Sequence, residues 1–416
     1  MPARPPHSRL AVVAVSALTA TLALAGCQQD EPASSSGTNR EAPAANAGAN
    51  LNKQDPPEAA AAPAEVSLNV KAAAKDVAVD TPVTLNVSDG TFEKVRVKVS
   101  DSGRVLAGSL NDEKTEWTAR NLLEPGTTYL VDARARNVDG EATRTKTRFQ
   151  TDDLTLDEQT YASLQPLKDE VVGIGMPVIV QFDIPVKKKA AFERRMEVTA
   201  SPETVGSWHW ISDQEVHWRP KSYWKPGTDV HVDVNVNGVH AGNGIYGQMN
   251  RSTDFTIGRS VVMKTDIAKH QMKVFVGGEL VRTIPVTAGK PGFETRSGIK
   301  LIVEKFRVKV MDASTIGIEP GDSEYYNIPD VEYAQRVTYT GEFIHAAPWS
   351  VGSQGYSNVS HGCVGMSTED AAWLYGITHR GDPVVTKGTD RGLEDNNGWT
   401  DWEQSFAEYK QASALD

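Results

Sequence analysis

The sequence predicts a mainly β protein, with two tandem immunoglobulin-like β-sandwich domains, a third β-rich domain and a C-terminal helical tail. Three observations lead to this fold class. Short segments of alternating polar and apolar residues recur from about residue 65, and turn signals such as Asp89-Gly90 separate them. A pattern of Trp, Pro-Gly-Thr and Asp then repeats once. A further strand-rich stretch follows, from about residue 259 to Thr386.

The chain begins with a segment typical of an exported lipoprotein. Two arginines precede an apolar run, Leu10 to Ala25, that is too short to span a bilayer with margin. The run ends in Leu24-Ala25-Gly26-Cys27, which resembles a bacterial lipobox. We expect residues 1–26 to be a signal peptide and Cys27 to carry a lipid that anchors the protein to the membrane. The alternative is an ordinary signal peptide with a chance cysteine.

Residues 27–64 are expected to form a disordered tether between this anchor and the globular domains. They are rich in Ala, Pro, Ser, Asn and Glu and contain almost no aliphatic or aromatic side chains. Such a segment cannot bury enough apolar surface to order itself. We therefore expect the folded domains to work at some distance from the lipid surface.

Two blocks, residues 65–151 and 152–257, are each predicted to fold as an immunoglobulin-like sandwich. Trp117 and Trp218 are each followed, eight residues later, by the sequence Pro-Gly-Thr. The offset of 101 residues between the two patterns is about the size of one immunoglobulin domain. Either Trp could stack on a ligand, but a core position before a turn is more common, so we expect both to be buried.

Residues 258–387 are predicted to form the third domain. Alternating residues at 260–266 and 271–276 indicate strands, and Gly277-Gly278 indicates a hairpin turn after the second of them. One helix is expected from Thr368, its cap, to Thr378.

A tail, residues 388–416, follows the third domain. Thr400-Asp401-Trp402-Glu403 has the spacing of a capping box, so we expect a helix to begin there. Trp402, Phe406 and Tyr409 would then lie on one face of that helix. We expect this face to pack on the third domain.

Composition and cysteine content limit the classes of function and partner that are expected. The formal net charge of -11 argues against a nucleic-acid partner, since phosphate binding needs clustered Lys and Arg. The nine histidines and the carboxylates have no metal-ligand spacing, so no metal or cofactor is expected. If Cys27 is lipidated, Cys363 is an unpaired thiol in an exported protein. It is then either a reactive cysteine or a buried inert one.

The stretch from Ile344 to Ser367 carries the residues for covalent catalysis. It contains His345 and, after fourteen residues (346–359), Ser360-His361-Gly362-Cys363. Thiolate is the reactive form of cysteine, and an imidazole can take the thiol proton near neutral pH. Gly362 leaves room for a carbonyl group to approach the sulfur. The backbone N–H groups around Gly362 and Cys363 are candidates for an oxyanion hole.

Two histidines are candidates for the base. His361 is close to Cys363 in sequence, but near neighbours in an extended strand point to different sides. His345 can face the sulfur from a separate strand. Spacing alone does not decide between them.

This segment resembles the signature of the L,D-transpeptidase catalytic domain of the YkuD type. That signature is a His, then fourteen to seventeen residues, then Ser or Thr followed by His-Gly-Cys. The order of domains is similar to that of L,D-transpeptidases of the actinobacterial lipoprotein type, over roughly residues 65–416. The resemblance implies that Cys363 attacks a carbonyl, that His345 takes the thiol proton, and that the Ala346 carbonyl holds the imidazole tautomer.

The resemblance also implies roles for residues around the nucleophile. Backbone donors and pocket walls come from Ser360, His361 and Gly362. Tyr326 matches a lid tyrosine over the substrate, although Tyr325 is adjacent. The remaining matches are a pocket-lining methionine, Met311, and an aromatic side chain that supports the loop, Trp349.

One position departs from the family pattern. The pattern continues with Cys, a hydrophobic residue and Asn, whereas this chain has Cys363-Val364-Gly365. The missing amide removes a hydrogen-bonding group two residues beyond the nucleophile. We expect an altered substrate position at Gly365 and retained activity, because nucleophile and base are both present.

The resemblance implies that the substrate is the stem peptide of peptidoglycan, in the cell wall outside the cytoplasm. Cys363 would form a thioester with release of D-alanine, and an amine of a neighbouring stem would resolve it to a 3→3 cross-link. Carbapenems are expected to acylate the same thiol. Two alternatives stay open: an L,D-carboxypeptidase that uses water as acceptor, and a catalytically weak scaffold that binds the wall.

Overall fold

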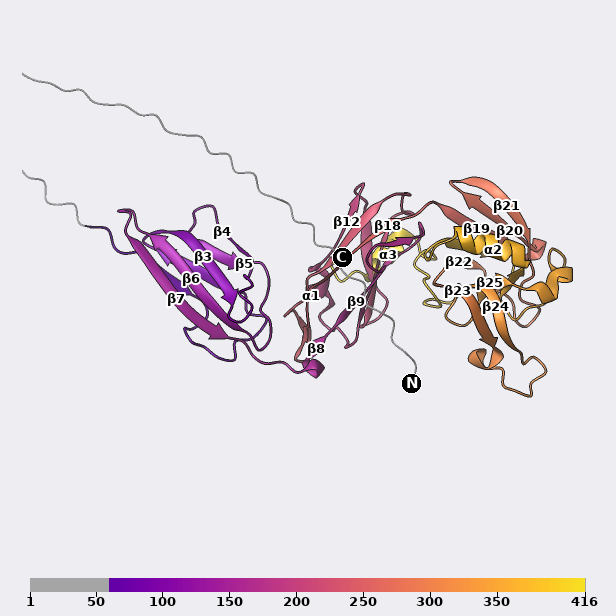
Figure 1. Cartoon of the computed structure of the whole chain (residues 1–416), viewed down its shortest axis with the longest axis horizontal. Coiled ribbons are helices and arrows are strands. Elements are labelled where there is room, and N and C mark those ends of the chain that lie inside the picture. The colour runs from indigo at the N-terminus through magenta and orange to yellow at the C-terminus, as the bar shows by residue number, and fades with distance from the viewer. Residues whose placement is uncertain (1–59, 416) are drawn as a thin grey trace, which may run out of the picture. The chain divides into compact units, whose positions relative to one another are not determined.

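Two layers of strands form the first block of the chain. The computed structural model describes residues 60–415. One layer has the strand order β1-β2-β5-β4 and the other β3-β6-β7 (Figure 1). The bounds are β1 Glu65–Leu68, β2 Thr84–Ser88, β3 Thr91–Val99, β4 Gly108–Leu110, β5 Glu116–Ala119, β6 Thr128–Arg136 and β7 Ala142–Gln150.

The first block has its own core between these layers. Trp117 of β5 is buried there, and the rings of Tyr129 and Phe149 stack with their centroids 5.3 Å apart. Ala64 is buried in the same core, so packing begins just inside the segment expected to be a tether. The proposed lipid site Cys27 and residues 28–59 of the tether lie outside the described residues.

The second block also has two four-stranded sheets, in the orders β13-β14-β11-β9 and β10-β18-β15-β12. A small sheet, β16-β17-β8, and the short helix α1 complete it. The bounds are β8 Gln159–Thr160, β9 Ala162–Gln165, β10 Glu170–Val172, β11 Val178–Phe182, α1 Lys189–Glu193, β12 Met196–Ser201, β13 Gly206–Trp210, β14 Glu215–Pro220, β15 Asp229–Val234, β16 His240–Gly242, β17 Ile245–Gly247 and β18 Arg251–Ile257.

The sequence repeat corresponds to a structural one. Trp117 and Trp218 are both buried in their cores, as the sequence predicts. The glycine of each Pro-Gly pair has a positive φ, +58° at Gly126 and +77° at Gly227. Their N–H groups donate to Asp152 and Ile257, at the end of each block. Each block thus has the same kind of Pro-Gly turn, hydrogen-bonded to the segment near the end of the block.

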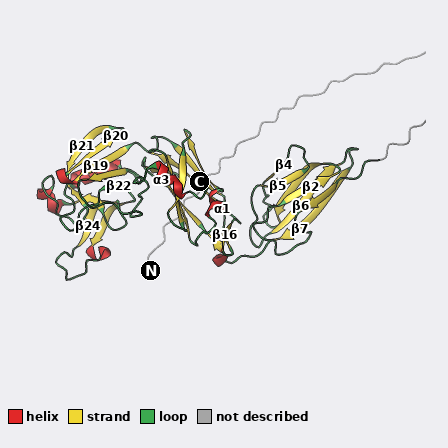
Figure 2. Ribbon diagram, turned by 180° about the vertical axis from the view of Figure 1, so that it is seen from behind, coloured by secondary structure: helices red, strands yellow, loops and turns green. Residues whose placement is uncertain are grey.

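The third block has a five-stranded sheet, β21-β20-β19-β27-β22, and a four-stranded sheet, β23-β24-β25-β26. The turn after β20 has positive φ at both Gly277 and Gly278, as expected for a tight hairpin. Strands predominate in the described chain and helices are short (Figure 2), so the mainly β fold class is confirmed. The bounds are β19 Val261–Asp266, β20 Gln271–Val276, β21 Glu279–Pro285, β22 Gly298–Leu301, β23 Glu304–Asp312, β24 Asn327–Arg336, β25 Phe343–Ala346, β26 Val364–Met366 and β27 Pro383–Lys387.

Helix α2, Thr368–Ile377, begins at the residue predicted, but its cap lies one position earlier. The Ser367 side chain accepts a hydrogen bond from the Asp370 N–H, so Ser367 and not Thr368 is the N-cap. Ala371 and Leu374 of this helix are buried in the core of the third block. No helix of residues 60–415 is long and apolar enough to cross a membrane.

The tail differs from the expectation in where its helix begins and what it contacts. Helix α3 spans Phe406–Tyr409, with Ser405 as N-cap and Glu408 completing the capping box, so the predicted start at Thr400 is wrong. The two residues of the expected capping box have other partners: the Thr400 hydroxyl accepts from the Asn396 N–H, and the Glu403 carboxylate accepts from the Ile299 N–H. The Asp401 carboxylate between them accepts from His217 and Tyr409.

The expected packing of the tail on the third domain is also corrected by its contacts. The Tyr409 carbonyl accepts from His209 of β13 at 2.7 Å. The Arg219 guanidinium of β14 lies over the rings of Trp402, Phe406 and Tyr409. Trp402 precedes α3, so the three do not lie on one face of a helix as predicted. All three rings pack on the second block.

Candidate active site

Strands β25 and β26 bring the two predicted reactive residues to one cavity. They pair in parallel, with His345 opposite Gly365, and Cys363 directly precedes β26. Both side chains are largely buried, with 5% of His345 and 8% of Cys363 exposed. Both line a cavity of about 220 Å³. The thiol and the imidazole therefore face the same enclosed space.

The imidazole of His345 is held in one tautomer. Its Nδ1 lies 2.7 Å from the Ala346 carbonyl oxygen, which can only accept, so Nδ1 carries the proton. Burial lowers the pKa of His345, so the ring is neutral at pH 7 and Nε2 can take a proton. The Trp349 ring stacks on it, with centroids 5.8 Å apart. These are the properties of a general base.

The Cys363 thiol is protonated in the resting site. Burial raises its pKa to about 12. The thiol donates to the Gly341 carbonyl, with sulfur and oxygen 3.6 Å apart. The backbone N–H of Phe343 also hydrogen-bonds the sulfur and acts to lower the pKa. The nucleophile therefore needs a base at the moment of attack.

Hydrogen bonds fix the loop around the nucleophile. The Ser360 hydroxyl donates to the Cys363 carbonyl at 2.7 Å and accepts from the Gly362 N–H at 3.1 Å. Thr295 Oγ1 donates to the Gly362 carbonyl at 2.8 Å. Gly362 has φ +118°, a backbone conformation that only glycine adopts readily. The loop is thus rigid before substrate arrives.

His361 lines the same cavity as His345 and Cys363, but its imidazole is bonded to another segment of the chain. Its Nε2 lies 2.7 Å from a carboxylate oxygen of Glu324, which also contacts the Lys290 ammonium. The Phe293 and Tyr326 rings pack on its imidazole at 4.6 and 4.9 Å. The side chain is engaged by the β23–β24 connection, which leaves His345 as the better-placed base.

The β23–β24 hairpin contributes the two pocket residues that the resemblance implied. Met311 and Tyr326 line the cavity that contains His345, and both also line a second cavity of about 260 Å³ on the other side of Cys363. Burial raises the pKa of Tyr326 to about 12, so its hydroxyl stays protonated and can donate. The adjacent Tyr325 is not among the lining residues of either cavity.

Gly365 lies where two backbones approach closely. Its N–H donates to the Thr287 carbonyl at 2.8 Å, and its own carbonyl accepts from the Thr287 N–H at 2.9 Å. A Cβ at this position would meet Ala347 Cβ at 2.8 Å and Thr287 Cγ2 at 3.1 Å. Both are tighter than ordinary contacts, so the site is built around the absence of a side chain.

Several contributors have no sequence signal that would have identified them. Gly341 acts through its carbonyl, and Thr295 and Glu324 reach the loop from distant segments. Only tertiary pairing brings these residues to the site. The described residues contain no group of three or more His, Cys, Asp or Glu side chains suited to a metal ion.

Comparison with known proteins gives two family matches. The model for the L,D-transpeptidase catalytic domain (YkuD) matches residues 260–386, and the model for the bacterial Ig domain matches residues 74–240. The second match spans both N-terminal blocks.

Two curated relatives align over most of the chain. L,D-transpeptidase 2 of Mycobacterium tuberculosis is 36% identical over 84% of this chain and 85% of its own length. L,D-transpeptidase 5 of the same species is 35% identical over 82% of this chain and 75% of its own length.

Solved structures are also similar over about half of the chain. The LD transpeptidase LdtMt1 in complex with imipenem has 36% identity and a TM-score of 0.48, and covers 55% of this chain and 99% of its own. An L,D-transpeptidase from Mycobacterium smegmatis has 35% identity and a TM-score of 0.46, with coverage of 55% and 99%.

Proposed function

As this chain belongs to the L,D-transpeptidase family of peptidoglycan enzymes, we propose that it forms 3→3 cross-links through a thioester on Cys363. The observation that carries the proposal is the shared cavity of Cys363 and His345, with the imidazole tautomer held by Ala346. Cys363 attacks the carbonyl of the third stem residue, and the terminal D-alanine leaves. An amine of a second stem then resolves the thioester.

Proton transfer accompanies the attack. The thiol is a poor acid in its buried setting, so His345 Nε2 takes its proton as the sulfur–carbon bond forms. The same proton goes from His345 to the D-alanine amine as the carbon–nitrogen bond breaks. In the second half-reaction His345 accepts a proton from the incoming amine and returns it to the Cys363 sulfur as the carbon–sulfur bond breaks. The Cys363 N–H is the proposed donor to the oxyanion.

The two cavities suggest separate routes for the two substrates. The leaving amine and the attacking amine must both exchange a proton with His345, so they use the cavity that His345 lines. The donor stem then occupies the second cavity, which reaches Cys363 past Gly341 and Phe343. Tyr326 and Met311 line both cavities, which supports their role as a lid over the junction.

The acyl-enzyme can be tested by weighing the intact protein after incubation with a tetrapeptide donor or a carbapenem. A relative in complex with imipenem motivates the second reagent. We expect one covalent adduct on the native chain and none on Cys363→Ala. No adduct on the native chain, or the same adduct on Cys363→Ala, overturns the mechanism.

The alternatives make different predictions for the products. With an acceptor amine, a transpeptidase yields the cross-linked dimer, whereas an L,D-carboxypeptidase yields tripeptide whether or not an amine is added. A catalytically weak scaffold binds isolated wall but gives no adduct.

We also propose the arrangement outside the active site. Residues 65–151 and 152–257 act as spacer domains, residues 258–387 as the catalytic domain, and residues 388–416 as a tail that ties the catalytic domain to the second spacer. Residues 1–26 direct export and Cys27 carries the lipid anchor. Labelling with a palmitate analogue tests the anchor: the native protein takes up label, and Cys27→Ala does not.

A further inference from the structure

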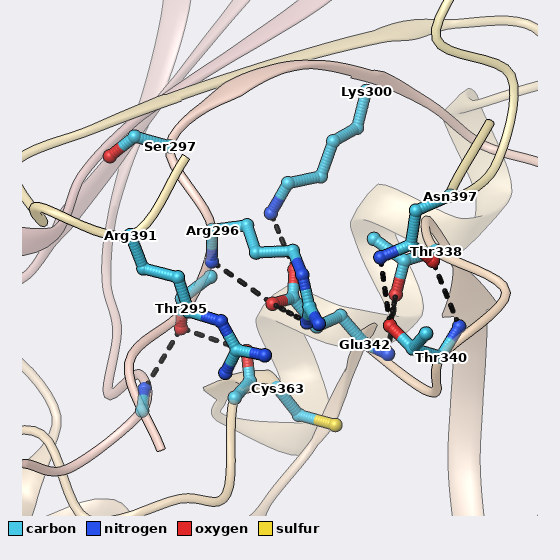
Figure 3. A network of polar contacts seen from close by, with 12 residues as sticks. Thr295, Arg296, Ser297, Lys300, Thr338, Thr340, Glu342, Cys363, Arg391 and Asn397 are labelled. Atoms are coloured by element: carbon cyan, nitrogen blue, oxygen red, sulfur yellow. Dashed lines mark hydrogen bonds and ion pairs between the residues drawn. The ribbon is translucent and has the colours of Figure 1, made fainter. Parts of the chain in front are cut away.

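A buried cluster of charged side chains lies behind the nucleophile loop (Figure 3). Both oxygens of the Glu342 carboxylate are occupied, one by Arg296 Nη1 at 3.0 Å and the other by Lys300 Nζ at 2.6 Å. The Arg296 backbone N–H donates to the same carboxylate at 3.0 Å. All three side chains are less than a tenth exposed. Arg296 also pairs with the Glu394 carboxylate, so the four side chains carry a formal net charge of zero.

This cluster holds the segment that touches the sulfur. Glu342 lies between Gly341, whose carbonyl accepts from the thiol, and Phe343, whose N–H donates to the sulfur. Since its carboxylate is fixed by Arg296 and Lys300, both backbone groups are held against Cys363. The ion pairs of Glu342 therefore act on Cys363 through the two residues next to it, Gly341 and Phe343.

The cluster also supports the loop from its other end. Thr295, the residue before Arg296, donates to the Gly362 carbonyl at 2.8 Å. A Cβ built on Gly362 would lie 3.5 Å from Cγ of Glu342, so the glutamate side chain packs directly beneath the loop. One pair of neighbouring residues, Thr295 and Arg296, thus binds both the loop and the carboxylate behind it.

Stability alone is a weak reason for such a cluster. Removing three charges from water has a large free-energy cost, and apolar residues of similar volume are often as stable or more so. Arg296 also contacts the more exposed Glu394, but Lys300 has Glu342 as its only ion-pair partner among the described residues. A buried lysine against the wall of the site suggests an electrostatic role at the sulfur.

We propose that Glu342 is a positioning residue for acyl transfer, and that Lys300, held against it, places a positive charge behind Cys363 that stabilises the thiolate as it forms. This inference rests on the proposed role of Cys363 as the nucleophile. The Lys300 ammonium lies 2.6 Å from the Glu342 carboxylate and is almost completely buried. Burial lowers the pKa of Lys300, and Glu342 opposes that effect.

Other charged and titratable side chains also lie near the sulfur. The Arg336 guanidinium of β24 lies over the Phe343 ring and is paired with Glu304 at 2.6 Å. Tyr326 approaches from the lid and His345 from β25, and both are neutral at pH 7. Among these charges, Glu342 acts to raise the pKa of Cys363, whereas Lys300 and Arg336 act to lower it.

The test is the rate of Cys363 alkylation by iodoacetamide at pH 8, followed by intact mass. We expect Lys300→Met to slow alkylation about tenfold, which corresponds to a rise of about one unit in the pKa of the thiol. Lys300→Arg retains the charge and should restore the native rate. Lys305→Met is the matched control, because Lys305 binds carbonyls at the end of α2 and no member of the cluster.

Glu342→Gln separates position from charge. It removes a negative charge, so it should not slow alkylation, yet it should lower the turnover number for cross-linking about tenfold because the Gly341–Phe343 wall is loosened. If Lys300→Met does not fold, Lys300→Gln carries the same expectation. An unchanged alkylation rate in the neutral Lys300 variants, or a slower one in Glu342→Gln, overturns the inference. Failure of the native chain to form an acyl adduct would instead reject the proposed function.

Discussion

Gly365 is constrained from both sides of its strand. Its backbone exchanges two hydrogen bonds with Thr287, and β26 also pairs with β25, so the strand cannot shift to admit a side chain. The family pattern has an asparagine here. The site therefore differs from that pattern in the close backbone packing at Gly365, and not only in the missing amide.

We predict that Gly365→Asn destabilises the protein by about 1–3 kcal/mol, because the new Cβ would press on Ala347 and Thr287. The measurement is urea unfolding, together with the rate of adduct formation, which should fall. Gly352→Asn is the control, since no atom lies within 4 Å of a Cβ built there. A Gly365→Asn variant that is as stable as the native chain and acylates faster would contradict this account.

Residues that match the spacing of the family signature could be predicted from the sequence, whereas residues that act through the backbone could not. His345 and Cys363 are separated by a recognisable spacing, and each has side-chain chemistry that suggests its role. Gly341 contributes only a carbonyl oxygen, and any residue type has one. Thr295 reaches the loop through a contact between segments 67 residues apart, which no local pattern encodes.

At the scale of elements, local sequence signals predicted the turns and strands better than they predicted which strands pair. The Gly277-Gly278 hairpin and the repeated Pro-Gly turns have the conformations that their residue types require. The parallel pairing of β25 with β26 follows from tertiary packing, so the sequence did not predict it. The tail helix was misplaced for a similar reason, because the Glu403 carboxylate of the expected capping box accepts instead from the N–H of the distant Ile299.

In each of the two N-terminal blocks, a glycine packs closely against a tryptophan of the neighbouring strand. A Cβ on Gly206 would overlap the Trp218 ring and lie 2.6 Å from the Arg219 carbonyl oxygen. A Cβ on Gly108 would overlap Trp117 in the same way. Each glycine lets the indole of the neighbouring strand lie flat across the backbone.

We predict opposite effects for two glycine-to-alanine substitutions. Gly206→Ala should lower the free energy of unfolding by about 1–3 kcal/mol, because the ring must move. Gly376→Ala, in the middle of the last turn of α2 with open space around it, should raise it by about 0.5–1 kcal/mol. Thermal unfolding followed by circular dichroism measures both, and changes of the same sign would contradict the packing argument.

For the whole molecule, one buried cluster ties the end of the chain to the second block. His217 of β14 is bonded on one side to Asp401 and on the other to Glu215, each at 2.8 Å. Tyr409 donates to the same Asp401 oxygen at 3.0 Å. Burial lowers the pKa of His217, but the two carboxylates more than offset this and raise it to about 9.

This raised pKa predicts how stability depends on pH. An unfolded histidine titrates near 6.5, so the stabilisation is fully present below that pH and is lost as pH rises through about 9. We expect the free energy of unfolding of the second block to fall by about 2–3 kcal/mol between pH 6.5 and 9.5. Urea unfolding followed by tryptophan fluorescence reports this block, because Trp208, Trp210, Trp218 and Trp224 are buried in its core. Asp401→Asn removes the carboxylate that favours the charged ring, so its stability should be lower at pH 6.5 and nearly flat to pH 9.5. A native protein with no loss over this range, or a variant with the native slope, would mean that His217 is neutral in the folded chain and that the tail is held by packing alone.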